Sequence, residues 1–475
     1  MTIPIYLEQL IPAFRGNKLI EALPPLMSEQ TAFESMQSLP EYSAEQRKWP
    51  SAERIVAVSQ LSDVFIPLER GVTLAQTIDS MIRHGYKGRC PATYGAVHEK
   101  LFQMQESKQG FQNLSCGSTA ATSTALIGVS GGGKTASVRR ALSYFPQVIY
   151  HPEMNITQIT HLSMDMSTVG DSVKGLATGI FHQIDRLVPS ANSYEHYGKN
   201  SRASVDTMIR NAARVMHDFR VGILVIEEIQ NLLNKSKDTE RAMTEVVTMT
   251  NEIGLPLLFT GTNKATQLFE TDFRLTRRVV GGGLEHWERL KAPSTGASND
   301  WDFFIERLWK FQWTTELAAL TLDFSKLLYD RSQGIIDIAL KLFMAAQVVA
   351  IRNNYPSITK ELLEHAYQTQ LKTIHPMLEA LRDNDMYALG RFPDIAPVKI
   401  RNKRHGDSAL LSVNKAVKAA VETQKIASTH QISLPKASKH KNAKLVLPKR
   451  TTLPGRTPFS PVGVPRDSLG DGLRV

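Results

Sequence analysis

The chain has 475 residues, 42% of them hydrophobic and 21% charged, which is enough for two or three domains and ordinary for a folded protein. No stretch approaches the ~18 uncharged apolar residues of a membrane span, and the first residues lack the pattern of an export signal. The formal net charge of +10 comes from the end of the chain. Residues 397–475 hold 16 of the 56 Lys and Arg and 4 of the 46 acids, a net charge of +12. The remaining residues hold 40 basic and 42 acidic side chains, a net charge of −2.

Residues 1–115 mix helical patterns with several proline breaks and are predicted to form an N-terminal adaptor region. Within it, Leu74, Ile78 and Ile82 are spaced four residues apart, which places them on one face of a helix. The two cysteines, Cys90 and Cys116, have no partner at metal-binding spacing, which favours reduced thiols in a cytosolic protein.

Residues 116–298 alternate short apolar runs with longer amphipathic segments. The runs are 124–128, 159–166, 222–226 and 255–261, and the helical segments are 135–145, 171–187, 205–219 and 239–253. This alternation predicts an α/β domain in which helices cover both faces of a central parallel sheet.

Residues 299–395 predict a smaller domain of consecutive helices, with breaks at Gln333-Gly334 and Tyr355-Pro356. In residues 396–475 the periodicity fades and Ser, Lys, Pro and Gly dominate, which predicts a largely disordered basic tail. Such a tail commonly contacts nucleic acid or an acidic protein surface.

The phosphate loop, residues 128–135 (GVSGGGKT), matches the pattern GxxxxGK[ST] and lies between an apolar run and a helix. Its glycines let backbone N–H groups face a phosphate, while Lys134 would neutralise the β and γ oxygens and the Thr135 hydroxyl would bind Mg²⁺. A glycine-rich surface loop is the alternative. The predicted ATP-binding residues are Gly128, Ser130, Gly131, Gly132, Gly133, Lys134, Thr135 and Ala136.

An uninterrupted apolar run, residues 222–226, ends in Glu227 and Glu228. In a P-loop ATPase, Glu227 would orient the magnesium shell and Glu228 would act as general base on the attacking water. Asp is the usual residue at the first of these positions. The extra methylene of Glu227 therefore leaves the rate of hydrolysis open.

Polar residues follow the run at 255–261. Thr262 and Asn263 stand where a sensor of the γ-phosphate would lie, although an ordinary strand-end turn is the alternative. Arg274, Arg277 and Arg278 come next and, because a planar guanidinium suits phosphoryl charge, are candidates to reach the ATP of a neighbouring subunit. Arg277 and Arg278 are assigned a catalytic role, all three stay candidates for the finger itself, and a solvated basic face is the alternative.

This order of motifs resembles that of the AAA+ ATPases, in which a helical lid follows the P-loop domain. Residues 225–232 (VIEEIQNL) resemble the VIDEIQxL block of the transposition regulators TnsC and TniB. Four further segments look like TnsC of cut-and-paste bacterial transposons with heteromeric transposases. They are IEALPPL (20–26), PQVIYH (146–151), SQGIIDIALKLF (332–343) and HPMLEALR (375–382).

The resemblance implies an ATP- and Mg²⁺-dependent regulator in the bacterial cytoplasm, associated with the nucleoid. It would form a homo-oligomeric ring or filament on double-stranded DNA and connect a target-selection protein to transposase subunits, with hydrolysis controlling assembly. Asp337 stands where many AAA+ proteins have a lid arginine, so none is expected from that position. Sequence-independent DNA contact is expected from Lys174, Lys199 and Arg202.

Two other functions fit the same motifs. One is an AAA+ replication accessory similar to a helicase loader, although the segments at 20–26 and 375–382 argue against it. The other is a scaffold with a slow ATPase core. For the tail we expect a docking segment for the transposase or DNA, because segments such as 444–450 (KLVLPKR) interleave basic and apolar residues. A solubilising tail without a partner is the alternative.

Overall fold

The structure is a computed structural model in which the described residues are 1–89, 123–166, 172–199, 203–234, 253–270, 283–293 and 299–396, together with 244, 246, 247 and 250. The described residues from Thr2 to Ala396 belong to one compact unit. Several predictions concern residues outside this set: both cysteines, Arg202, Arg274, Arg277, Arg278, most of the predicted helix at 239–253, and the tail from 397 onward.

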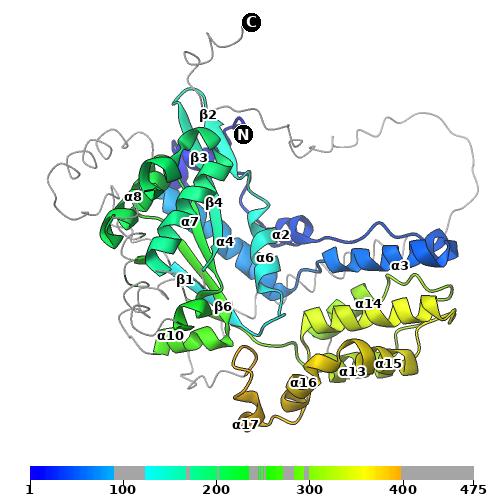
Figure 1. The fold of residues 1–475 in the computed structure, drawn as a ribbon. Helices are drawn as coiled ribbons and strands as arrows, with labels where there is room; N and C mark the ends of the chain where they lie inside the picture. Colours follow the sequence, from blue (N-terminus) through cyan, green and yellow to red (C-terminus); the bar gives the residue numbers. More distant parts are fainter. Residues whose placement is uncertain are drawn as a thin grey trace, which may run out of the picture. The chain divides into compact units, whose positions relative to one another are not determined.

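A five-stranded sheet lies at the centre of this unit (Figure 1). Its strands run in the order β4-β5-β6-β1-β7, and every neighbouring pair is parallel. The strand bounds are β1 Ser123–Gly128, β4 His161–Asp165, β5 Ile223–Glu227, β6 Leu257–Thr262 and β7 Leu284–Trp287. The central strands β1, β5 and β6 are buried along their whole length, as expected for apolar strands covered on both faces. The α/β prediction is therefore confirmed.

One predicted run, residues 159–166, is divided between two sheets. β2 Val148–His151 pairs antiparallel with β3 Ile156–Ile159, and β4 begins at His161. The chain changes sheets at Thr160, whose buried hydroxyl donates to the Pro146 carbonyl at 2.9 Å. The prediction of a single strand was wrong because Thr160 lies between the two sheets and satisfies its hydroxyl locally.

The longer helices of the sheet domain agree with the sequence pattern. Three predicted segments form α6 Lys134–Leu142, α7 Ser172–Leu187 and α8 Val205–Asp218. The short α10 Thr266–Glu270 was not predicted. The helix predicted around Leu74 is α4 Glu69–Lys87, and Leu74, Ile78 and Ile82 are all fully buried on it. α4 packs against α6 and against β5.

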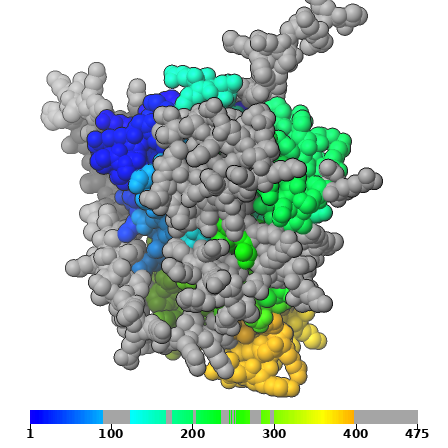
Figure 2. Space-filling model, turned by 90° about the vertical axis from the view of Figure 1, so that its left-hand side faces the viewer, coloured from blue at the N-terminus to red at the C-terminus, as the bar shows by residue number. Residues whose placement is uncertain are grey.

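The N-terminal residues do not form a separate body. They comprise η1 Pro12–Phe14, α1 Lys18–Glu21, α2 Glu29–Met36, η2 Ala44–Lys48, α3 Ser51–Ser59, η3 Gln60–Asp63 and α4. Apolar side chains of α1, α2 and α4 share one hydrophobic cluster with Leu126, Val138 and Leu258 of the sheet domain. Thr2 forms a parallel bridge with Ile149 of β2, and Figure 2 shows the blue N-terminal residues beside the cyan ones of that strand. The predicted adaptor region is thus integrated into the folded unit.

The helices from residue 300 onward form the lid. They are α12 Asp300–Leu308, α13 Leu322–Ser332, α14 Ile336–Arg352, α15 Lys360–Gln370, η9 Lys372–Ile374, α16 His375–Arg382 and α17 Met386–Leu389. α14 packs against α13, α15 and the N-terminal α3 (Figure 1). Within the described residues no single helix has the length and apolar composition of a membrane span, and α13 with α14 reaches them only as a pair bent by 118°.

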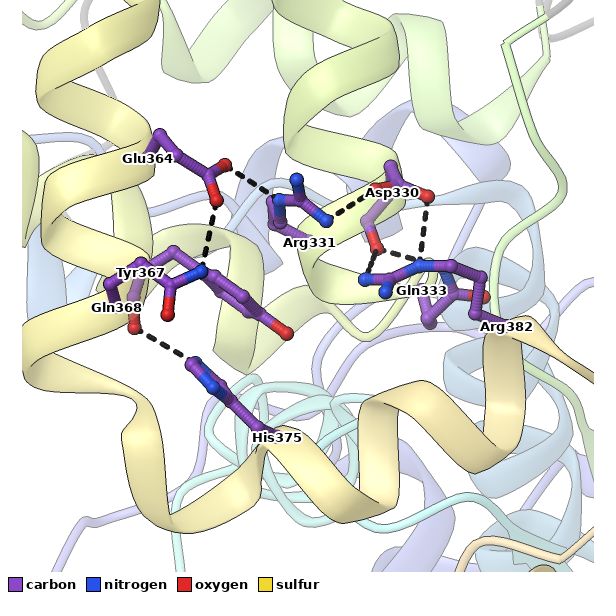
Figure 3. Close-up of polar contacts among 8 residues, drawn as sticks. All are labelled: Asp330, Arg331, Gln333, Glu364, Tyr367, Gln368, His375 and Arg382. Atoms are coloured by element: carbon purple, nitrogen blue, oxygen red, sulfur yellow. Dashed lines mark hydrogen bonds and ion pairs between the residues drawn. The ribbon is translucent and has the colours of Figure 1, made fainter.

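Ion pairs join three helices of the lid, and one of the residues involved, Arg382, belongs to the segment 375–382 that resembles TnsC (Figure 3). Asp330 at the end of α13 accepts from Arg382 of α16 at 3.0 Å and pairs with Arg331 at 2.8 Å. Arg331 also contacts Glu364 of α15 at 2.7 Å. The side chains are partly exposed, so each pair contributes little by itself, but together they fix the mutual positions of α13, α15 and α16.

Candidate nucleotide-binding site

The carboxyl ends of the parallel strands bring the predicted site residues to one edge of the sheet. β6 lies between β1 and β5, and Gly128 at the end of β1 is paired with Thr262 at the end of β6. On the other side of β6, Glu227 is the last residue of β5 and Glu228 follows it. Thr262 therefore stands beside the first residue of the phosphate loop, in the crevice where parallel α/β sheets bind their ligands.

The phosphate loop needs its glycines for conformation and for close packing. Gly131 and Gly133 have φ of +77° and +89°, which other residues adopt only with strain. A Cβ on Gly128 would lie 2.3 Å from the Trp287 carbonyl oxygen, and the Val129 N–H donates to that same oxygen at 3.1 Å. The loop is thereby fixed against β7 and leads directly into α6.

Lys134 is a buried cation held by its own loop. Lys134 is 8% exposed. Its Nζ donates to the carbonyls of Gly128 and Val129 at 2.9 and 2.8 Å. Burial lowers its pKa to about 8, partly offset by the negative charge of Glu228. Among the described residues no carboxylate forms a direct ion pair with Lys134. A buried ammonium of this kind favours an anionic ligand.

Glu227 and Glu228 lie in different environments. Glu227 is 2% exposed, and its carboxylate accepts from the Ser163 hydroxyl at 3.0 Å and lies 3.8 Å from Nε of the exposed Arg139. Glu228 is exposed and has φ of +57°, a strained conformation for a residue with a side chain. Gln230 holds Glu228 in place by donating to its carboxylate.

Gln230 also accepts from the Thr262 N–H at 3.1 Å, so one buried amide connects the acidic strand to the sensor strand. The pair of acids alone did not indicate a role for Gln230. Its position two residues after Glu228, in the segment 225–232 that resembles TnsC and TniB, could have indicated one.

The predicted sensor residues are buried and have defined partners. The Thr262 hydroxyl donates to the Asp394 carboxylate at 2.5 Å, and the Asn263 amide donates to the Ala396 carbonyl at 2.8 Å. The Ser130 N–H donates to the Asp394 carbonyl at 3.3 Å. Asn263 Oδ1 is buried without a hydrogen-bond partner. No sequence motif pointed to Asp394, which lies 132 residues from Thr262 in the chain.

Arg70, at the start of α4, supports the phosphate loop from the N-terminal region. Its guanidinium donates to the carbonyls of Gly132 at 3.0 Å and Glu288 at 2.7 Å and lies 4.7 Å from the centre of the Trp287 ring. Burial lowers its pKa to about 10. The sequence carried no signal for this role because the partners are backbone carbonyls more than sixty residues away.

The lid touches the loop at Gly131. The Asp337 N–H donates to the Gly131 carbonyl at 3.2 Å, and a Cβ on Gly131 would lie 2.9 Å from Ile335. The Asp337 carboxylate pairs with Lys341 at 2.7 Å. The residue at the lid-arginine position thus contacts the loop through its backbone.

The predicted DNA-binding residues Lys174 and Lys199 take no part in the contacts of the phosphate loop described above. Lys174 is half-buried on α7, and Lys199 forms an ion pair with Glu195 after the π-helical turn Tyr194–Gly198. Their role in DNA binding stays a prediction, as does that of Arg202.

The residues present fit a nucleotide phosphate with Mg²⁺. Lys134, the Ser130 N–H and the side chains of Thr262 and Asn263 are donors at one strand edge. The described residues hold no group of His, Cys, Asp and Glu side chains that could bind a metal by itself. A magnesium ion would therefore be held by phosphate oxygens together with the half-buried Thr135 and by Glu227.

These features define a P-loop AAA+ fold with a C-terminal helical lid. Consistent with it, residues 118–269 match a family model described as an AAA domain, which covers less than half of the chain. No curated protein matches the sequence.

Several solved structures are similar to this chain at low identity and low TM-score. The ORC1 protein of Aeropyrum pernix in complex with DNA is 14% identical, with a TM-score of 0.38 over 69% of this chain and 83% of that one. Cdc6p of Pyrobaculum aerophilum is 14% identical, with a TM-score of 0.34 over 70% and 86%. The RuvB branch migration motor of Thermotoga maritima is 12% identical, with a TM-score of 0.33 over 68% and 81%. At these TM-scores the likeness carries no argument about function.

Proposed function

We propose that this protein is an ATP-dependent regulator of transposition that assembles on double-stranded DNA and couples a target-selection protein to transposase subunits. The ATP-dependent part is supported above all by one observation, the buried Lys134 in a phosphate loop directly beside Thr262. The transposition part is supported by the segments that resemble TnsC, two of which contribute Asp337, Gln333 and Arg382 to contacts within the lid and with the loop.

Each residue of the site would have a separate role in ATP hydrolysis. Lys134 and the loop N–H groups would bind the phosphates, and Thr262 and Asn263 would detect the terminal one. A magnesium ion would neutralise phosphate charge and orient the terminal phosphoryl group. Glu228 would accept a proton from the attacking water, with Gln230 fixing the orientation of its carboxylate. Arg277 or Arg278 of a neighbouring subunit would stabilise the developing charge.

The test is binding to duplex DNA of arbitrary sequence. The wild type is expected to bind it with a non-hydrolysable ATP analogue and not without nucleotide, and Lys134→Ala to lose this binding because the phosphates lose their buried cation. Lys326→Ala, on the exposed face of α13, is the matched control and should bind like the wild type. Equal DNA binding by Lys134→Ala and the wild type would exclude ATP gating.

A second arm uses Glu228→Gln, which should slow hydrolysis by about a hundredfold while leaving ATP bound. This variant should therefore bind DNA with ATP itself. Equal and negligible turnover in Glu228→Gln and the wild type would favour the slow-ATPase scaffold. Recovery of a replicative helicase instead of a transposase on the immobilised protein would favour the replication accessory.

A further inference from the structure

The chain after the last lid helix reaches back to the phosphate loop. Residues 391–396, the returning segment, follow α17 through a series of turns in which the Phe392 N–H donates to the Leu389 carbonyl at 2.9 Å and the Ile395 N–H to the Phe392 carbonyl at 3.1 Å. Leu389 and Ile395 are buried in the hydrophobic cluster of the lid. The returning segment is therefore anchored in the lid and presents Asp394 to the sheet domain.

Three acceptor groups of the returning segment form hydrogen bonds with three donor groups of the nucleotide site. They are the Asp394 carbonyl for the Ser130 N–H, the Asp394 carboxylate for the Thr262 hydroxyl, and the Ala396 carbonyl for the Asn263 amide. Two of these bonds, at 2.5 and 2.8 Å, have buried side chains as their donors. The segment thus joins the phosphate loop to the sensor strand.

These donors are also the ones that a terminal phosphate would need. The Ser130 N–H and the Thr262 hydroxyl each have one hydrogen to donate, so neither can serve Asp394 and a phosphate oxygen together at full strength. The Asp394 carboxylate is close enough to Lys134 to act on its charge, and a phosphate in that position would repel the carboxylate. Asp394 and the terminal phosphate therefore exclude each other on grounds of both hydrogen bonding and charge.

We infer that the returning segment is an autoinhibitory contact: it competes with the terminal phosphate of ATP, and ATP binding displaces it from Ser130, Thr262 and Asn263. This inference rests on the proposed binding of ATP at the same site. Because such coupling is reciprocal, whatever holds the segment in place lowers the affinity for ATP, and whatever pulls it away raises it. ADP, which lacks the terminal phosphate, should compete far less with Asp394.

The test compares Asp394→Ala with its parent in the full chain, both carrying Glu228→Gln to prevent hydrolysis. Titration calorimetry with Mg-ATP should show about tenfold tighter binding for Asp394→Ala, within the range usual for coupled sites, and a much smaller change with Mg-ADP. Asp383→Ala removes an exposed carboxylate at the end of α16 and should change neither affinity.

Equal ATP affinity in Asp394→Ala and its parent would overturn the autoinhibitory contact and leave the ATP site standing. Absence of ATP binding in both would overturn the ATP site and the contact together. Hydrogen exchange gives a measurement that needs no change at Asp394. In the Glu228→Gln protein, saturating ATP should speed exchange at the amides of Ile395 and Ala396, and ADP should not. Unchanged or slower exchange with ATP bound would overturn the inference.

Discussion

Lys134 shows how burial prepares a residue for a charged ligand. Burial removes its ammonium from water and lowers its pKa from 10.5 to about 8, although two backbone carbonyls accept hydrogen bonds from it. Any phosphate that binds beside it will stabilise the charged form and raise that pKa again. Nucleotide binding and protonation of Lys134 are therefore linked.

This linkage predicts the pH dependence of ATP binding. If phosphates bind the charged form, the Kd for ATP should rise about tenfold between pH 7 and pH 9, because most of the Lys134 side chains lose their proton across a pKa of about 8. Calorimetric titration at both pH values measures it. Lys134→Arg keeps its charge throughout, so whatever affinity it retains should be flat over this interval. An equally flat profile in the wild type would contradict the shifted pKa.

The same shift affects stability with a definite sign. Between pH about 8 and 10.5 the unfolded chain binds more protons at Lys134 than the folded chain does. Lys134 therefore destabilises the fold below pH 8, and this penalty is relieved as the pH rises through that interval.

At the residue scale, the sequence was informative where the chemistry is local. The phosphate loop and Glu227-Glu228 are continuous segments whose spacing follows from the backbone they require, and the fold brings them to one strand edge. Asp394 and Arg70 escaped prediction because their partners are distant in the chain, and Gln230 because its link to the Thr262 N–H spans 32 residues. Three-dimensional contact is needed to find them.

At the scale of elements, the link between the sheet domain and the lid depends on one glycine. Gly334, between α13 and α14, has φ of +74°, and its carbonyl accepts from the Leu290 N–H at 3.0 Å. A Cβ there would lie 2.3 Å from the Leu290 carbonyl oxygen, which also accepts from the Tyr329 hydroxyl at 3.1 Å. This glycine belongs to the segment at 332–343 that resembles TnsC, so part of that resemblance has a packing reason.

Gly334→Ala should therefore destabilise the protein through both strain and overlap. Gly16→Ala is the matched control, because Gly16 has the same φ of +74° and nothing within 4 Å of a new Cβ. We expect Gly334→Ala to lose about 1–3 kcal/mol more than Gly16→Ala in the free energy of unfolding, the usual cost of overpacking. Urea unfolding followed by circular dichroism measures the difference. Equal losses would show that the linker moves aside at no cost.

The elements that the sequence failed to predict are short and lie at edges. β7 has only four residues, is partly exposed, and pairs with the sheet on the β1 side alone. β2 is also four residues long and belongs to a two-stranded pair. Neither segment is long enough for an apolar run to stand out. The buried central strands and the lid helices were predicted because burial on both faces, or on one helical face, imposes a pattern.

At the scale of the whole molecule, the N-terminal region holds the other parts together. Its apolar residues enter the cluster of the sheet domain, and Val58, Leu61 and Leu68 enter the cluster of the lid. The sequence did not show this integration because proline breaks and mixed helical patterns describe a peripheral region and an integrated one equally well.

Removing residues 1–115 is thus expected to expose apolar surface on both bodies. Leu126, Val138 and Leu258 would lose their cover from α4, and the truncated chain should bind a hydrophobic dye and lose a sharp thermal transition. A chain ending at residue 396 retains both clusters and serves as control, with an expected transition like that of the full protein. Cooperative melting of the N-terminal truncation would restore the interpretation as a separate adaptor.

The strand order has a consequence for synthesis on the ribosome. β1, which leads into the phosphate loop, pairs with β6 and β7 and with neither β4 nor β5. Its register partners Leu257 and Leu284 are made long after it, and at typical rates of chain elongation the wait to the end of β7 at Trp287 is roughly ten to thirty seconds. During that interval the nascent phosphate-loop strand has unmet backbone hydrogen bonds. A chaperone that shields this strand during translation would therefore act on β1.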